Sequence, residues 1–304
     1  MNKQKTLRGF RINGNSSDIN ANTSNLLSLL ESRVRDSVIE DRRVKENEDD
    51  PETEAIIMNY YKFSRTTCFG SIIKVKEGKD TGLMPKSFLK EPSVSFEELS
   101  KLDDENLIIV YQYYFMLNNN ALVTDFYSPS ETYPFEIYLN ALLSDVRECV
   151  YEIIPYVEVN PKIDPAKIKS FTLTDNFLNQ QLDATTGVST QNLTLKDKIL
   201  HQVFGDVGKL GDYDITDVFN ARLVFDVLKP QKMSYDDCSK LLGRAINRMR
   251  QPDDFETELK GGAGKIKGGK LLKTSKVKVP LTESGLVNEA NYSIIMEKFL
   301  NELK

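Results

Sequence analysis

The residues of this chain best suited to chemistry are lysines that gather near its carboxyl end. Residues 259–279 contain seven lysines and no acidic residue, and two glycine-rich stretches lie between them. The lysines are Lys260, Lys265, Lys267, Lys270, Lys273, Lys276 and Lys278. Ammonium groups replace the counterions condensed on a nucleic acid, and glycine lets the main chain approach an anion closely. The segment therefore predicts a surface that contacts phosphate groups.

A second group of cations precedes this segment on a predicted helix at 234–249. Ser234 is a suitable N-cap, and apolar residues then recur at helical spacing, which predicts one buried face. Lys240, Arg244 and Arg248 lie at positions i, i+4 and i+8, so they form a basic stripe along the helix. We expect this stripe to extend the phosphate-binding surface.

Charge is unevenly distributed along the chain, whose formal net charge is −5. Residues 1–228 carry 25 basic and 35 acidic side chains, a net of −10, whereas residues 229–304 carry 15 basic and 10 acidic side chains, a net of +5. Local potential decides where a polyanion docks. A basic quarter on an acidic chain therefore indicates sequence-neutral binding, and no zinc-finger or RNA-recognition pattern indicates readout of bases.

The scarcity of histidine and cysteine excludes several classes of enzyme. His201 is the single histidine, which excludes a metalloprotease helix and a three-histidine zinc site. Cys68, Cys149 and Cys238 are too far apart for a Cys-x-x-Cys pair, and we expect them to be reduced, buried thiols. No Gly-x-Ser-x-Gly elbow is present. The sequence thus predicts no catalytic residue, no metal site and no cofactor.

Two motifs offer alternative chemistry. Residues 264–270 approach a phosphate-binding loop, but Leu271 stands where that loop requires Ser or Thr to hold magnesium. Glu258 and Lys260 fit the Glu-x-Lys part of a metal-dependent nuclease, with Asp253 upstream as a second ligand. The short spacing between the two acidic residues leaves little room for a hairpin. A nuclease that uses Glu258 and Lys260 is the alternative catalytic hypothesis.

Patterns of apolar residues favour an α+β fold. Strands are expected at 6–12, 55–63, 68–75, 107–116, 121–126, 221–228 and 276–279, and helices at 25–38, 138–150, 193–204, 234–249 and 286–303. Regular βαβα alternation is missing, which argues against a doubly wound parallel sheet. We therefore expect largely antiparallel sheets with flanking helices and a carboxyl-terminal helix. The length fits two α+β regions, at 1–160 and at 161–304, of which the second contains the basic segment.

No part of the sequence is suited to crossing a membrane. The amino terminus is polar and lacks the apolar region of a signal peptide. The longest apolar stretch, 107–117, is interrupted by Gln112 and is shorter than the roughly 20 residues of a spanning helix. We expect a cytoplasmic protein.

Hydrophobic and turn motifs follow one another along most of the chain. In the amino-terminal half they are Gly9-Phe10, a leucine-rich helix at 25–38, Phe69-Gly70 and Phe126-Tyr127-Ser128-Pro129. In the carboxyl-terminal half they are Val227-Leu228-Lys229-Pro230, Gln251-Pro252-Asp253-Asp254-Phe255, Glu258-Leu259-Lys260, the Gly/Lys segment and Val279-Pro280-Leu281. This series resembles the RexA family, the soluble component of the RexAB phage-exclusion systems of temperate phages. No catalytic residue comes with the resemblance.

The resemblance implies a cytoplasmic, non-enzymatic DNA-binding homodimer that senses phage infection and signals to a membrane-protein partner. Together with the basic segment, it leads us to expect sequence-nonspecific binding of double-stranded DNA in an anti-phage defence system that acts by phage exclusion or abortive infection. The other alternative is a protein-interaction module that does not bind DNA and whose acidic amino-terminal part inhibits a partner.

Overall fold

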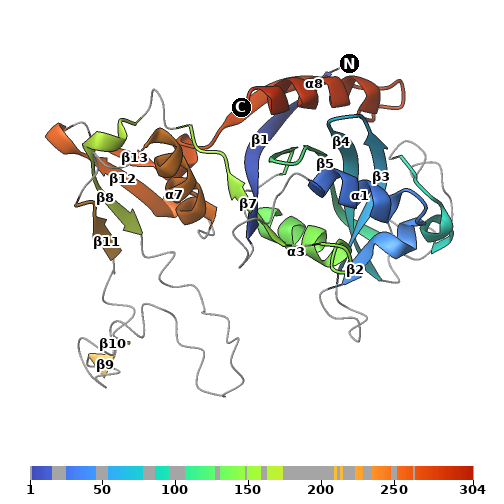
Figure 1. Cartoon of the computed structure of the whole chain (residues 1–304), viewed down its shortest axis with the longest axis horizontal. Helices are drawn as coiled ribbons and strands as arrows, with labels where there is room; N and C mark the ends of the chain where they lie inside the picture. Colours follow the sequence, from blue (N-terminus) through green and yellow to red (C-terminus); the bar gives the residue numbers. More distant parts are fainter. Residues whose placement is uncertain are drawn as a thin grey trace. The chain divides into compact units, whose positions relative to one another are not determined.

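The chain forms two compact units, and the sequence of one is inserted within the sequence of the other (Figure 1). The computed structural model describes residues 2–15, 25–45, 54–77, 86–95, 107–126, 131–147, 149–158, 163–173, 209–210, 213–214, 223–228, 234–247, 252–262 and 264–303. Unit 1 comprises Met1–Tyr156 and Lys273–Lys304, and unit 2 comprises Val157–Leu272. The helix expected at 193–204, with His201, lies outside the described residues.

Unit 1 is built on an eight-stranded antiparallel sheet. Its strands are β1 (Asn2–Asn15), β2 (Arg43–Lys45), β3 (Ala55–Phe63), β4 (Cys68–Glu77), β5 (Leu107–Leu117), β6 (Ala121–Thr124), β7 (Val150–Pro155) and β14 (Thr274–Pro280). Their order is β14-β1-β6-β5-β4-β3-β2, and β7 pairs with the second half of β1. The helices are α1 (Leu26–Val34), α3 (Thr132–Leu142) and α8 (Glu289–Asn301), with short 3-10 turns η2 (Ile39–Arg42) and η3 (Lys86–Lys90).

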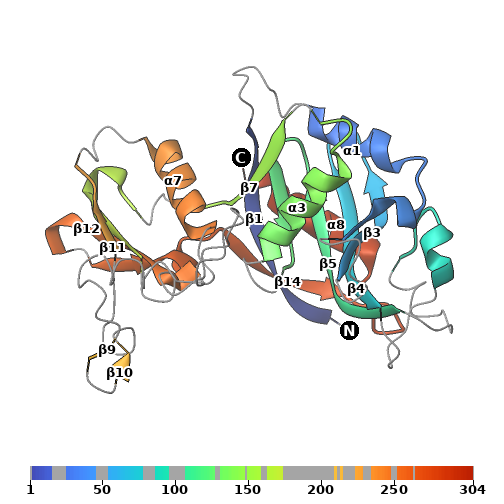
Figure 2. The same ribbon diagram turned by 90° about the horizontal axis from the view of Figure 1, so that it is seen from below.

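Helices cover both faces of this sheet (Figure 2). On one face, Leu7 of β1 belongs to the same buried cluster as Met296 of α8. On the other face, Phe10 of β1 is buried with Leu30 of α1 and Leu139 of α3. Because neighbouring strand residues point to opposite faces, one strand supplies both cores. β1 is therefore the central element of unit 1.

Gly9 of β1 joins the points at which the chain leaves and re-enters unit 1. Its amide donates to the Lys273 carbonyl at 3.1 Å, and its carbonyl accepts from the Tyr156 amide at 2.8 Å. A Cβ at this position would lie 2.5 Å from a methyl group of Leu303, so any larger residue would require the Leu303 side chain to move. The end of β7 and the start of β14 are thus fixed side by side on β1.

The described part of unit 2 is built on a four-stranded antiparallel sheet, against which a helix packs. The sheet has the order β11-β8-β12-β13, and a separate pair is formed by β9 and β10. The elements are η5 (Pro165–Lys167), β8 (Ile168–Leu173), β9 (Lys209–Leu210), β10 (Tyr213–Asp214), β11 (Leu223–Asp226), α7 (Tyr235–Asn247), η7 (Pro252–Asp254), β12 (Phe255–Leu259), η8 (Lys260–Gly262), β13 (Lys265–Lys267) and η9 (Gly268–Lys270). Leu242 and Ile246 of α7 are buried against Leu173 and Phe255 of the sheet.

The expected fold class is confirmed, since the chain is α+β with antiparallel sheets and a carboxyl-terminal helix. The helix expected at 138–150 instead spans Thr132–Leu142, because Pro134 is compatible with a first turn and the segment after Leu142 forms turns. Residues 273–304, which we expected to belong with 161–272, fall in unit 1 because β14 pairs with β1. No helix in the described ranges has the length and apolarity to cross a bilayer.

Candidate nucleic-acid interface

The predicted basic surface is divided between the two units. Lys273, Lys276 and Lys278 lie in unit 1. The part in unit 2 consists of Lys240, Arg244, Lys260, Lys265, Lys267 and Lys270, and Arg248 lies outside the described residues. We therefore describe each group by itself.

The unit 2 lysines are carried mostly by the hairpin between β12 and β13. Its turn contains Gly261 and Gly264 at φ of 73° and 89°, left-handed values that favour glycine, and Lys260 is exposed there. Lys265 and Lys267 are exposed on the short strand β13. The hairpin thus exposes ammonium groups beside a turn whose left-handed backbone angles favour glycine.

Carboxylates on β12 share the face of this hairpin. Lys265 lies opposite Glu258 and Lys267 lies opposite Glu256, and Lys265 forms an ion pair with Glu256 at 3.6 Å. Glu258 accepts a hydrogen bond from Lys169 at 2.7 Å, and this bond lowers the pKa of Glu258. Opposite charges in such cross-strand positions attract one another and compete with an external phosphate. The hairpin is accordingly a mixed surface, with unopposed charge mainly at its turn.

The stripe on α7 is also partly neutralised. Lys240 pairs with Asp236, one helical turn earlier, at 2.8 Å. Arg244 is exposed in the next turn. Exposed pairs at this spacing contribute only about 0.3–0.5 kcal/mol, so a polyanion displaces them readily. The side chains of this stripe can therefore reach a ligand, although Lys240 already has a partner within the helix.

A more uniform cationic surface lies on β1 and β14 of unit 1. Residues that face one another across an antiparallel pair point to the same side of the sheet. Lys276 lies opposite Thr6, and Lys278 lies opposite Gln4. We define the β1–β14 polar face as six of the residues on this side, which are Asn2, Gln4, Thr6, Thr274, Lys276 and Lys278; Arg8, opposite Thr274, and Pro280, opposite Asn2, lie on the same side but are not included in it. It contains two cations and no carboxylate.

The lysines of the β1–β14 polar face are well placed to meet an anion. Lys276 and Lys278 are exposed, and neither forms an ion pair with any residue that the structure describes. Val277 and Val279 alternate with them and pack towards the core under α8. Arg8, which follows this face along β1, donates to the Phe126 carbonyl, and burial lowers the pKa of its guanidinium. The local sequence Lys-Val-Lys-Val indicated this half-exposed strand, but the contribution of Gln4 and Thr6 depends on long-range pairing.

The residues proposed for nuclease chemistry are engaged with other groups. Glu258 is paired with Lys169, and Asp253 accepts a hydrogen bond from the Gly269 amide at 3.1 Å. Lys260 lies beyond the end of β12, in η8. Within the described ranges, no three Asp, Glu, His or Cys side chains are grouped to hold a metal ion. Glu258 therefore belongs to a charged sheet surface, and Lys260 lies in the turn that follows it.

Comparison with known proteins assigns the chain to no family. No protein-family model matches it, and no curated protein matches it significantly.

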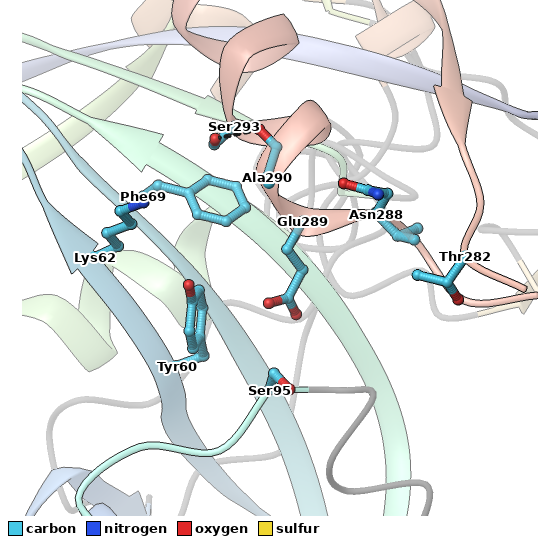
Figure 3. A pocket seen from close by; sticks show the side chains of 10 residues that line it. Tyr60, Lys62, Phe69, Ser95, Thr282, Asn288, Glu289, Ala290 and Ser293 are labelled. Carbon is cyan, nitrogen blue, oxygen red and sulfur yellow. Dashed lines mark hydrogen bonds between the residues drawn. The ribbon is translucent and has the colours of Figure 1, made fainter. Parts of the chain in front are cut away.

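Unit 1 also contains a pocket of about 300 Å³ beside the first turn of α8. Figure 3 shows Glu289 projecting from this turn towards Tyr60 and Ser95, with Lys62 at another wall. The Tyr114 hydroxyl donates to Glu289 at 3.2 Å, which fixes the carboxylate. One acidic and one basic side chain around an aromatic wall suit a small polar molecule. The sequence did not indicate this pocket, because its residues come from 60–95 and 282–293.

Proposed function

We propose that the protein binds the sugar–phosphate backbone of double-stranded DNA without sequence preference, and that the β1–β14 polar face is its principal contact. The observation that carries this proposal is the exposure of Lys276 and Lys278 on a face without carboxylates. Exposed ammonium groups on such a face release counterions from DNA and gain affinity that does not depend on sequence. The hairpin turn of unit 2, with Lys260 and the exposed Lys267, supplies further phosphate contacts.

The proposal is tested by neutralising the two lysines together. In the double variant Lys276→Gln/Lys278→Gln, we expect weaker binding to every duplex. The slope of log affinity against log salt should fall by about two, since each phosphate contact contributes roughly 0.9. Fluorescence anisotropy of labelled duplexes over a salt series measures both quantities.

A matched control separates local contact from net charge. Lys90→Gln/Lys298→Gln removes the same charge from exposed positions elsewhere in unit 1, and its binding should equal that of the wild type. Equal affinity and equal salt slope in the wild type and in Lys276→Gln/Lys278→Gln would reject the β1–β14 polar face as the contact.

The wider role that we propose is a sensor in phage exclusion, cytoplasmic and coupled to a membrane-protein partner. This part is supported by the resemblance of the sequence to the RexA family. It predicts that cells carrying the gene together with that of its partner restrict a superinfecting phage. Restriction should fall in the Lys276→Gln/Lys278→Gln variant if DNA binding provides the signal. Unchanged plating of phage on cells with both genes would contradict the role.

A further inference from the structure

The pocket beside the first turn of α8 lies within unit 1, and all the residues that line it belong to the described part of the chain. Its volume of about 300 Å³ is at the lower end of the range for sites that hold small molecules. The walls come from β3 and β4, from Ser95 and from residues 282–293. They include the carboxylate of Glu289 and the ammonium group of Lys62. These opposite charges restrict the kind of molecule that the pocket can hold.

The carboxylate of Glu289 is held in place by the protein itself. The Tyr114 hydroxyl donates to it at 3.2 Å. The Tyr114 ring in turn contacts the rings of Phe69 and Tyr292, at centroid distances of 5.8 and 5.3 Å. A carboxylate has about four lone-pair sites, so Glu289 can accept from a ligand while it accepts from Tyr114. A donor that enters the pocket therefore meets an acceptor whose position is already set.

The first turn of α8, which carries Glu289, is also fixed. The Asn288 side chain accepts from the Asn291 amide at 3.0 Å and so caps the helix. The Asn288 amide donates to the Pro280 carbonyl at 2.9 Å, which joins this turn to the end of β14. Binding to a wall that is already ordered costs less conformational entropy than binding to a wall that must be ordered by the ligand. This side of the pocket is therefore preorganised.

Two aromatic rings form the wall between the charged groups of the pocket. Tyr60 and Phe69 contact each other edge to face at a centroid distance of 6.2 Å, and Figure 3 shows them between Lys62 and Glu289. Lys62 lies opposite Phe69 in the pairing of β3 with β4, so the two side chains share one face of the sheet. Lys62 is exposed and forms no ion pair with any residue that the structure describes. The pocket thus has an acidic end, an aromatic middle and a basic end.

We propose that this pocket binds a zwitterion whose ammonium and carboxylate groups are separated by an apolar body, as in an ω-amino acid or a short peptide. The ammonium group donates to Glu289, and the neighbouring faces of Tyr60 and Phe69 attract the same charge. The apolar body lies along these rings, and the carboxylate pairs with Lys62. A simple cation is repelled by Lys62 and a simple anion by Glu289, whereas a zwitterion matches both ends.

Three compounds with the same straight carbon chain test the charges of the ligand. They are ε-aminocaproate, which is a zwitterion, hexylamine, which is only a cation, and hexanoate, which is only an anion. Chemical-shift changes in amide NMR spectra of the full-length wild type measure the affinity of each in the millimolar range. We expect ε-aminocaproate to bind at least about tenfold more tightly than either of the others, since each of them lacks one charged partner. Absence of saturable binding by ε-aminocaproate, or equal binding by hexylamine or hexanoate, would overturn the proposal.

Two substitutions assign the two ends of the pocket. Glu289→Gln keeps the shape of the side chain and should weaken ε-aminocaproate and hexylamine by at least about tenfold, but not hexanoate. Lys62→Gln should weaken ε-aminocaproate and hexanoate, but not hexylamine. Glu297→Gln and Lys298→Gln, at exposed positions of α8, are the matched controls and should bind all three compounds as the wild type does.

Equal binding of ε-aminocaproate by the wild type and by Glu289→Gln would show that the pocket is not the site. The comparison of the three compounds uses only the wild type, so it decides the matter even where a variant does not fold. The pocket shares no residue with the β1–β14 polar face, and DNA binding is therefore a separate readout that can hold or fail in either case.

Discussion

At the scale of single residues, Arg42 stands out in unit 1 because its guanidinium is fully buried. It donates to the carbonyls of Met58 at 2.9 Å, Ser37 at 3.1 Å and Pro92 at 2.7 Å. Burial lowers the pKa of Arg42, yet arginine begins so high that it stays charged. The planar fork reaches three separate chain segments, which no other side chain can do. Arg42 therefore joins the turn after α1 to β3 and to the loop after η3.

Replacing this guanidinium should destabilise unit 1 severely. Arg42→Met leaves several buried carbonyls unsatisfied, at roughly 1–3 kcal/mol each, so we expect a loss of about 3 kcal/mol or more in the free energy of unfolding. Urea denaturation followed by circular dichroism measures it. Arg65→Met, at an exposed position, is the control and should change the free energy by less than about 0.5 kcal/mol. Equal stability of the two variants would show that the buried hydrogen bonds contribute little.

At the scale of elements, a polar network under α8 fastens this helix to the sheet. Asp125, after β6, forms an ion pair with Lys5 and accepts from the Tyr114 amide at 2.7 Å and the Tyr292 hydroxyl at 3.1 Å. The Tyr114 hydroxyl donates to Glu289 at the start of α8. Burial first, and then these neighbouring carboxylates, raises the pKa of both tyrosines well above the ordinary value. The helix is thus held by tyrosines that must remain protonated.

This network predicts a loss of stability at alkaline pH. A group whose pKa is raised on folding contributes stability that is fully present below its unfolded pKa, about 10 for tyrosine, and is lost as pH rises towards the folded value. The free energy of unfolding should therefore fall above pH about 10. Tyr292→Phe should lower stability at neutral pH but flatten this decline, whereas Tyr133→Phe, on an exposed position of α3, should leave the decline unchanged. Urea titrations at a series of alkaline pH values measure the free energy of unfolding of both variants. A decline that is as steep in Tyr292→Phe as in the wild type would exclude the network as its cause.

The same elements show what the sequence could and could not predict. The helix at 286–303 and the alternating Lys-Val-Lys-Val strand follow from local periodicity, and both are present as α8 and β14. The pairing of β14 with β1 joins residues about 270 positions apart, and nothing local encodes it. Lysines that lie close together in the sequence were consequently expected on one surface. In the structure, Lys270 belongs to unit 2 and Lys276 belongs to unit 1. The sequence did not predict the carboxylates opposite β13 for the same reason, since the spacing of apolar residues does not reveal which residues of two paired strands face each other.

At the scale of the whole molecule, the insertion of unit 2 has a simple geometry at its ends. Within unit 2, Val157 and Leu272 form a β-bridge, and the Glu158 amide donates to the Leu271 carbonyl at 2.8 Å. Within unit 1, the Lys273 amide donates to the Tyr156 carbonyl at 2.8 Å. Each unit therefore brings its own two chain ends together, as an insertion that folds independently requires. Each also has its own buried apolar clusters.

This geometry predicts that unit 1 folds when unit 2 is removed. A linker of about four Gly and Ser residues from Tyr156 to Lys273 matches the short loops that join antiparallel strands. We expect the shortened chain to unfold cooperatively and to retain DNA binding, because it keeps the β1–β14 polar face. Adding Lys276→Gln/Lys278→Gln to the shortened chain is the control that should eliminate its DNA binding. A folded unit 1 without affinity for DNA would instead assign the contact to the unit 2 hairpin, where glycine shapes the turn beside Lys260.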